Sequence, residues 1–273
     1  MIRRLYPQGK KKAFNITYDD GVLQDIRFVE MLNRYNLKGT FNLNSELMFS
    51  QFEWVHPSGL VVKRLPVHTV VDLYRNHEIA SHSLTHPYMH DLSENEILHQ
   101  MGRDKYNLEQ VFGREVTGFA VPFSFYSNLI ADCARRIGFE YARCSDESYS
   151  YIPPENYYWW TAGTYHINPR FKSFAEGFFT AKNELALLQI VGHSYDLETE
   201  NMWDYMDNLL RRISKDDSII SLTNSELVRY LKSMRSAEIN DKYITNHSET
   251  ELWFEVSGNV VKVNPHSRFE IAF

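Results

Sequence analysis

Polar side chains that can bind metal ions or transfer protons follow several strand-like runs of this chain. The segment Thr17–Gly21 reads TYDDG and places the carboxylates of Asp19 and Asp20 side by side, directly after such a run. Two adjacent carboxylates at a strand end are costly to bury without partners. Because Asp-Gly is also a common turn dipeptide, this motif alone leaves both a turn and a functional site open.

A histidine-rich stretch between positions 68 and 99 holds six of the eleven histidines. Within it, SHSLTH places His82 and His86 four residues apart, a spacing that allows both imidazoles to bind one metal ion. Pro87 discourages a helix from continuing past this motif, so we expect the pair on a loop or a single turn. For the other four histidines a role in the core or at the surface is the preferred interpretation; these are His68, His77, His90 and His99.

A further histidine, His193, follows another strand-like run in the segment GHSYD. Two histidines and one aspartate are a typical ligand set for a catalytic divalent metal. In α/β barrels, reactive groups gather at the C-terminal ends of the strands. We therefore predict a metal site at this rim, formed by the two histidines of SHSLTH and one carboxylate of TYDDG, with His193 at the same rim.

The strand-like runs that carry these motifs alternate with amphipathic helix-like segments, which predicts a parallel sheet covered by helices. Seven such strands fit a distorted α/β barrel better than an open doubly wound sheet, and the chain has no dinucleotide-binding fingerprint. The predicted strands are Ala13–Tyr18, Thr40–Asn44, Glu78–Ser81, Gly118–Val121, Tyr141–Cys144, Leu187–Gly192 and Ile219–Thr223. The predicted helices include Gln24–Tyr35, a helix that begins at Ser93 with a capping box to Glu96, Asn201–Ile213 and Ser225–Ser233.

Two irregular stretches, residues 51–66 and 146–177, interrupt this alternation, and long irregular segments of this kind are often functional loops. From about Ser236 the pattern changes to short β-like pieces. We therefore predict a barrel domain over residues 1–235 and a small C-terminal β appendage over residues 236–273.

The composition of the 273 residues, with 43% apolar and 23% charged side chains, is ordinary for a soluble globular protein. The 29 basic and 35 acidic residues give a net charge of −6, which argues against a nucleic-acid binder. Cys133 and Cys144 cannot form a disulfide framework and are expected as free thiols. Since no run approaches the roughly 20 apolar residues of a membrane helix, and no signal-peptide core follows the basic N-terminus, we expect no membrane span and a cytoplasmic location.

Together these motifs resemble those of the polysaccharide deacetylases of the NodB-homology type, carbohydrate esterase family 4. TYDDG resembles their first motif, SHSLTH their second and GHSYD their last, while Ala120–Phe123 lies where the third motif, Arg-x-Pro-aromatic, belongs. The order and spacing hold from about residue 13 to residue 225. The resemblance implies a distorted seven- to eight-stranded (β/α) barrel and metal-dependent removal of acetyl groups from sugars.

The resemblance also implies roles for individual residues. Asp20, His82 and His86 would bind one divalent ion, with Zn²⁺ as the default and Co²⁺ or Ni²⁺ as alternatives for the same ligands. Asp19 would be the general base for the attacking water, and His193 would be the general acid that protonates the leaving amine.

Two departures from the family pattern matter for these roles. Ala120 stands where the family has an arginine that pairs with the base carboxylate. Arg143, at the end of the next predicted strand, is a candidate replacement for that arginine. The open alternative is that Arg143 forms an ion pair elsewhere on the rim. The fourth motif, usually an Asp-Trp pair, has no clean match. Trp160 and His166 occupy that region and remain candidates for substrate contacts, while the partner of the catalytic histidine stays open. Phe123, aligned with the third-motif aromatic, could offer its backbone N–H to an oxyanion.

The sequence thus predicts a metal-dependent deacetylase that acts on an acetylated carbohydrate, and it leaves the oligomeric state open. One alternative is a catalytically weak or silent glycan-binding member of the same fold, suggested by the missing arginine. Another is a metal-dependent amidase that acts on a small non-sugar amide. Release of acetate from acetylated oligosaccharides would separate the first function from both others.

Overall fold

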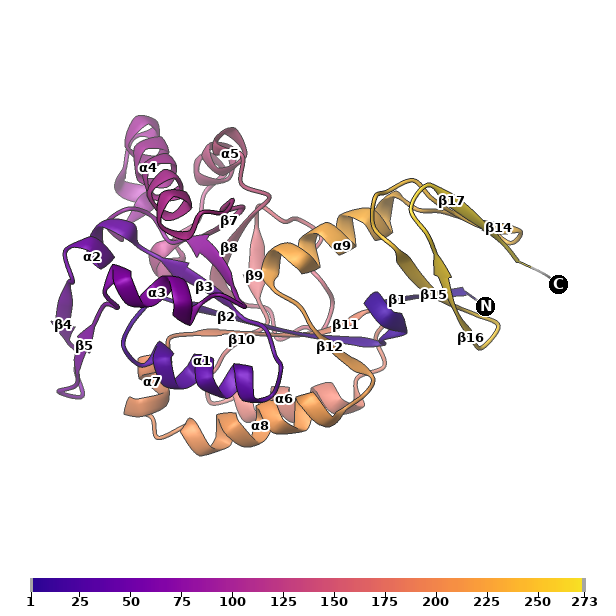
Figure 1. Cartoon of the computed structure of the whole chain (residues 1–273), viewed down its shortest axis with the longest axis horizontal. Helices are drawn as coiled ribbons and strands as arrows, with labels where there is room; N and C mark the ends of the chain where they lie inside the picture. The colour runs from indigo at the N-terminus through magenta and orange to yellow at the C-terminus, as the bar shows by residue number, and fades with distance from the viewer. Residues whose placement is uncertain (1, 272–273) are drawn as a thin grey trace.

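The computed structural model describes residues 2–271, whose centre is a curled parallel sheet with helices packed around it (Figure 1). Its strands are β2 (Lys12–Asp19), β3 (Thr40–Leu43), β6 (Glu78–Ser81), β7 (Gly118–Ala120), β8 (Tyr141–Glu147), β9 (Trp160–Ala162), β10 (Thr164–Tyr165), β11 (Ala186–Gly192) and β12 (Ile219–Ser221). They follow the order β10-β11-β2-β3-β6-β7-β8-β9, and β12 also pairs with β2. All pairings described in this sheet are parallel, so the carboxyl ends of its strands share one edge. The predicted distorted α/β barrel is confirmed.

Amphipathic helices cover the outside of the sheet. In α1 (Asp25–Arg34), for example, Phe28, Val29 and Leu32 recur at helical spacing and are buried against the strands. The helix α4 (Glu94–Phe112) begins at the predicted capping box between Ser93 and Glu96. The other helices are α2 (Ser45–Phe49), α3 (Val67–Leu73), α5 (Asn128–Ile137), α6 (Phe171–Thr180), α7 (Ser194–Thr199), α8 (Trp203–Lys215) and α9 (Asn224–Ser236), with short 3₁₀ turns η1 (Pro7–Gly9), η2 (Met89–Asp91) and η3 (Pro122–Ser124).

The seven predicted strands are present as β2, β3, β6, β7, β8, β11 and β12. The structure adds β9 and β10 inside the stretch 146–177, and a hairpin of β4 (Glu53–Val55) and β5 (Val61–Lys63) inside the stretch 51–66. We expected both stretches to be irregular. These strands are two or three residues long, which is too short for a strand periodicity to show in the sequence.

A small β unit lies at one end of the molecule, beyond α9 (Figure 1). The N-terminal strand β1 (Ile2–Leu5) belongs to it, because Ile2–Leu5 pairs antiparallel with Val256–Trp253. The predicted barrel domain over residues 1–235 includes these N-terminal residues, because no local pattern encodes a pairing between segments so far apart in the sequence. The remaining strands of the unit are β13 (Glu238–Ile239), β14 (Tyr243–Asn246), β15 (Leu252–Val256), β16 (Asn259–Val263) and β17 (Ser267–Glu270).

Two buried apolar clusters hold the sheet in place. The first lies between the sheet and the outer helices and includes Phe14, Phe41 and Phe119. The second joins the sheet to α9 and β15 and includes Tyr141 and Trp160. Because successive strand residues point to opposite faces, the strands are packed on both sides and position the polar residues at their ends.

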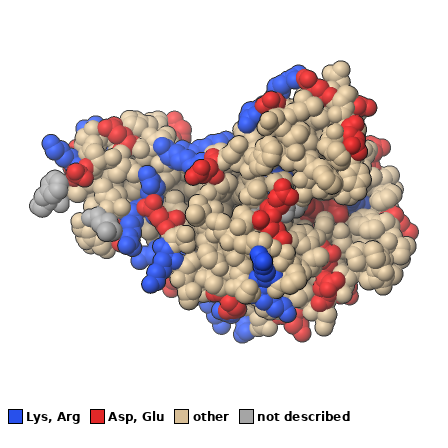
Figure 2. Space-filling view, turned by 180° about the vertical axis from the view of Figure 1, so that it is seen from behind, with Lys and Arg blue, Asp and Glu red and all other residues tan. Residues whose placement is uncertain are grey.

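The surface carries both signs of charge. On the face shown in Figure 2, Lys and Arg side chains are interspersed with Asp and Glu among uncharged residues. None of the helices within residues 2–271 combines the length and apolar character that crossing a membrane requires. Cys133 and Cys144 are both buried free thiols.

Candidate active site

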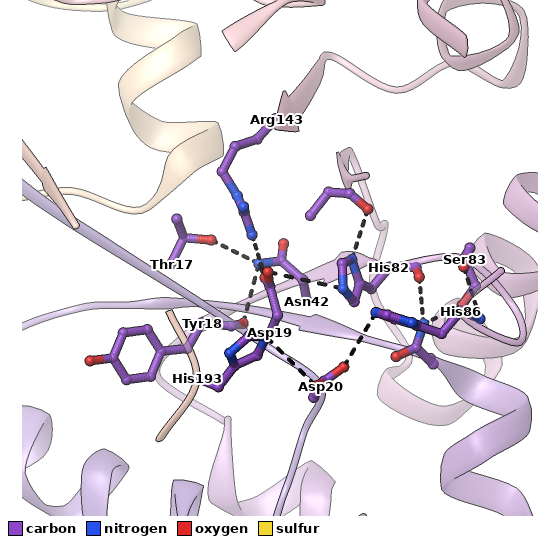
Figure 3. A network of polar contacts seen from close by, with 12 residues as sticks. Thr17, Tyr18, Asp19, Asp20, Asn42, His82, Ser83, His86, Arg143 and His193 are labelled. Carbon is purple, nitrogen blue, oxygen red and sulfur yellow. Dashed lines mark hydrogen bonds and ion pairs between the residues drawn. The ribbon is translucent and has the colours of Figure 1, made fainter. Parts of the chain in front are cut away.

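The polar motifs meet at the carboxyl edge of the sheet (Figure 3). Strand β2 ends at Asp19, and Asp20 leaves the strand with a φ of 84°. Strand β6 leads directly into His82, and β11 leads directly into His193. His86 lies on the loop after β6, as Pro87 predicts. Since β3 lies between β2 and β6 while β11 borders β2, the parallel order of the strands brings these side chains together.

Asp20, His82 and His86 form a group that could hold a metal ion, because one possible ligand atom of each lies within 4.8 Å of the others. His82 Nδ1 donates a hydrogen bond to the carbonyl oxygen of Ala120 at 2.8 Å, which leaves Nε2 as the unprotonated nitrogen. Burial lowers the pKa of His82, and it lowers the pKa of His86 to about 4. Both imidazoles are therefore neutral at pH 7, which is the form that binds metal ions.

Each carboxylate of TYDDG is paired with its own arginine. Arg143 Nη2 contacts Asp19 Oδ1, and Arg64 Nη1 lies 2.9 Å from Asp20 Oδ1. Burial would raise the pKa of both carboxyl groups, but the arginines and the nearby histidines outweigh it and hold both pKa values below their usual range. Both carboxylates are therefore ionised at neutral pH.

Arg143 reaches the carboxylate that the missing third-motif arginine would have contacted. Ala120 on β7 and Arg143 on β8 are Cα partners in the parallel pairing, so the guanidinium starts from the neighbouring strand at the same height. The side chain of Arg143 is fully buried, and Asn42 Nδ2 donates to the same Asp19 oxygen at 2.7 Å. The contact expected between Arg143 and Asp19 is therefore present, and its contribution to the free energy of unfolding can be measured.

We expect Arg143→Met to lower the free energy of unfolding by about 3–5 kcal/mol, because it leaves the buried carboxylate of Asp19 without its cation. Urea unfolding followed by circular dichroism measures this loss. The double variant Asp19→Asn/Arg143→Met removes the unpaired charge as well, so it should recover most of the lost stability. A double variant no more stable than the single one would show that the substitution disrupts something other than this ion pair.

His193 is held by Asp196 and Tyr165. Its Nδ1 lies 2.9 Å from Asp196 Oδ2 and 2.6 Å from the Tyr165 hydroxyl, which also donates to Asp196 Oδ2 at 2.6 Å. Burial would lower the pKa of His193, but the hydrogen bond to Asp196 and the charges of Asp20, Asp196 and Asp19 raise it to about 9. The imidazole is therefore protonated at neutral pH, as a general acid must be.

The partner of His193, which the sequence left open, is the aspartate of the same GHSYD motif. Asp196 lies in the first turn of α7, and side chains three residues apart around a helical turn can meet. The His-x-x-Asp spacing could have identified it. Arg64 and Tyr165 come from segments far from their partners in sequence, and no motif marks either of them.

Trp160 and His166 were expected to contact the substrate, but neither lines the pocket that contains Asp19, Asp20 and His193. Trp160 is 1% exposed and packs against Tyr141, with ring centroids 5.6 Å apart, within the second apolar cluster. His166 is also buried, and burial lowers its pKa to about 4. A Cβ at Gly192 would lie 2.1 Å from His166 Nδ1, so this ring requires the glycine before His193. Both side chains are therefore buried outside the pocket that Asp19, Asp20 and His193 line.

The pocket above the polar residues has aromatic walls. Phe123 lines one side and is 44% exposed; its ring stacks on Tyr88 at 4.0 Å and contacts the His86 ring at 4.5 Å. Phe52 and Trp54, on either side of the start of β4, also line the pocket. A polar floor between aromatic walls suits a substrate with flat apolar faces and one reactive polar group.

Among known proteins, the family model of the polysaccharide deacetylases matches residues 7–142 of this chain. A Mycobacterium smegmatis protein assigned to the polysaccharide deacetylases has a TM-score of 0.61 and 16% identity, with 85% of this chain and 94% of that chain covered. A carbohydrate esterase family 4 pseudoenzyme from Bacillus anthracis has a TM-score of 0.54 and 17% identity, with 83% and 68% covered. The match to the Streptococcus pyogenes deacetylase PplD, with a TM-score of 0.43 and 18% identity, covers 48% of this chain and 55% of that one. The comparison with curated proteins finds no match.

At these identities the likeness to the solved structures shows the fold. The family model adds the first two motifs, since the residues that it matches include both TYDDG and SHSLTH. The structure brings these two motifs together with GHSYD at one pocket. This chain is therefore a member of the polysaccharide deacetylase family.

Proposed function

We propose that this protein is a metal-dependent hydrolase that removes acetyl groups from an N-acetylated sugar or polysaccharide. The observation that carries the proposal is the combination of charges in one pocket. Two ionised carboxylates, two neutral imidazoles and one protonated imidazole lie together there. Family membership supports hydrolysis of an acetylated carbohydrate.

The donor set fits one divalent ion. Two imidazole nitrogens and one carboxylate suit Zn²⁺, and Co²⁺ or Ni²⁺ can take the same ligands. Asp20, His82 and His86 would hold the ion, because their ligand atoms converge and both histidines are neutral. When bound, such an ion lowers the pKa of a coordinated water towards about 7 and polarises the acetyl carbonyl.

The other residues of the pocket supply the proton transfers. Asp19 is ionised, and its Oδ2 lies 4.0 Å from His82 Nε2. Asp19 accepts a proton from the attacking water while the oxygen of that water bonds to the carbonyl carbon of the acetyl group. The backbone N–H of Phe123 is our candidate donor to the oxyanion that forms. His193, with Nε2 3.7 Å from Asp20 Oδ2, donates its proton to the leaving nitrogen as the C–N bond breaks. The products are acetate and a free amine.

The alternative of a catalytically silent member is weakened by the position of Arg143. That alternative arose from Ala120, and the contact of Arg143 with Asp19 supplies the missing cation from the next strand. The Bacillus anthracis protein with the same fold is described as a pseudoenzyme, so the fold alone does not establish activity. The aromatic walls favour a sugar over a small amide, because flat rings stack on sugar faces.

Acetate release tests the proposed function. The Zn²⁺-loaded protein is incubated separately with an N-acetylated glucosamine oligomer, an O-acetylated xylan and a small acetylated aryl amine, and acetate and free amine are quantified. We expect acetate and amine in equal amounts from the N-acetylated oligomer, and no more than background from Asp19→Asn. No acetate from any substrate would support the silent member, and acetate from the aryl amide alone would support the amidase.

A further inference from the structure

Arg64 is a buried cation that the proton transfers described above do not use. It directly follows β5 of the β4–β5 hairpin, and its side chain is 4% exposed. Its backbone connects the hairpin to the loop after TYDDG, because Arg64 N donates to Phe52 O at 3.1 Å and Arg64 forms a β-bridge with Val22. The hairpin therefore carries this arginine to the floor of the pocket, which Arg64 lines.

Arg64 contacts Asp20 at two places. Its Nη1 lies 2.9 Å from Asp20 Oδ1, and the same nitrogen donates to the backbone carbonyl of Asp20. The φ of 84° at Asp20 lies in the left-handed region, which residues other than glycine disfavour. One guanidinium thus holds both the carboxylate and the backbone of a residue in a conformation that it would not adopt readily by itself.

Aromatic packing fixes the guanidinium in turn. Arg64 Cζ lies 5.1 Å from the centroid of the Trp54 ring, which belongs to the same hairpin. Trp54 packs edge-on against Tyr195 at 5.6 Å, and Tyr195 stacks on His193 at 4.7 Å. The hairpin therefore supports both Asp20 and the ring beside the general acid.

We propose that Arg64 is a positioning residue that holds Asp20 in the conformation in which its carboxylate joins His82 and His86 around a divalent ion. This inference rests on the proposed metal-dependent function. If Arg64 acted only as a positive charge beside the Asp20 carboxylate, it would need no contact with the Asp20 carbonyl. Any other cationic side chain could then replace it. A positioning role instead needs the planar guanidinium, whose N–H groups have fixed directions.

The Zn²⁺ affinity of the metal-free protein, measured by competition with a chromogenic chelator, tests this role without an activity assay. Arg64→Lys keeps the positive charge, so a loss of Zn²⁺ affinity would come from the loss of the guanidinium contacts that hold Asp20 in place. We expect the affinity to fall by about 10–100-fold, the usual effect of altering a residue that orients a metal ligand. Arg75→Lys is the matched control, because Arg75 is an exposed arginine paired with Asp72 on the surface and should leave the affinity unchanged.

The absorption spectrum of the Co²⁺-loaded protein gives a second readout, since its visible bands follow the ligand geometry; we expect them to shift in Arg64→Lys. Arg64→Gln is the second variant, used if Arg64→Lys loses the circular dichroism spectrum of the native protein, and we expect weaker Zn²⁺ binding there too. Affinity and spectrum equal to those of the wild type would overturn the positioning role, as would tighter binding by Arg64→Gln. A wild-type protein that binds neither ion would overturn the proposed metal site itself, and the positioning role with it.

Discussion

Replacing both His82 and His86 with alanine is expected to abolish stoichiometric Zn²⁺ binding and to reduce acetate release to the background rate. The two imidazoles supply two of the three converging ligand atoms, and the carboxylate of Asp20 alone cannot hold the ion. Equilibrium dialysis against Zn²⁺ followed by elemental analysis measures the metal content of the folded protein.

The control for this experiment is the double variant His68→Ala/His99→Ala. Both histidines are exposed, and neither belongs to the predicted metal site. This control should keep the metal content and the activity of the wild type. Metal content that is unchanged after replacement of His82 and His86 would contradict the assignment of the site.

His193→Asn is expected to lower turnover by about 10²–10⁴-fold, the usual contribution of a positioned general acid. Its metal content should stay normal, because His193 is not a proposed ligand. The wild type should lose activity as the pH rises through the pKa of His193, since only the protonated imidazole can donate. The hydrogen bond to Asp196 raises this pKa, and Asp196 is not a proposed ligand, so its contribution persists when a metal is bound.

The pH dependence of kcat/KM separates this role from others. In His193→Asn the alkaline fall should disappear, and in Asp196→Asn it should move to lower pH because the imidazolium loses its acceptor. If His193→Asn loses its metal, His193 is a ligand instead. If it keeps full activity on the N-acetylated oligomer, a different group is the acid.

The group of candidate site residues could be predicted because its members lie in short motifs directly after strands. His82 follows β6 and His193 follows β11, and parallel pairing places all such positions at one edge of the sheet. Arg143 could be predicted for the same reason. It is one strand away from Ala120, and neighbours in a parallel pair lie at the same height.

Long-range contacts were beyond this kind of reasoning. Arg64 reaches Asp20 from a hairpin whose strands are three residues long, and the sequence shows no alternation there that would indicate it. Trp160 is a predicted substrate contact because it lies near the expected fourth motif, but its side chain packs in the apolar cluster beside Tyr141. Which face of such a short strand is buried depends on tertiary packing, which local patterns do not encode.

Anomalous diffraction at the zinc absorption edge, from crystals of the Zn²⁺-loaded protein, tests the central claim most directly. The metal site at the carboxyl edge of the sheet predicts one strong peak within about 2.0–2.2 Å of a ligand atom from each of Asp20, His82 and His86. His193 should lie outside the coordination sphere, with Nδ1 still held by Asp196. A stoichiometric ion bound elsewhere, or an ion at this place that takes His193 as a ligand, would contradict the account.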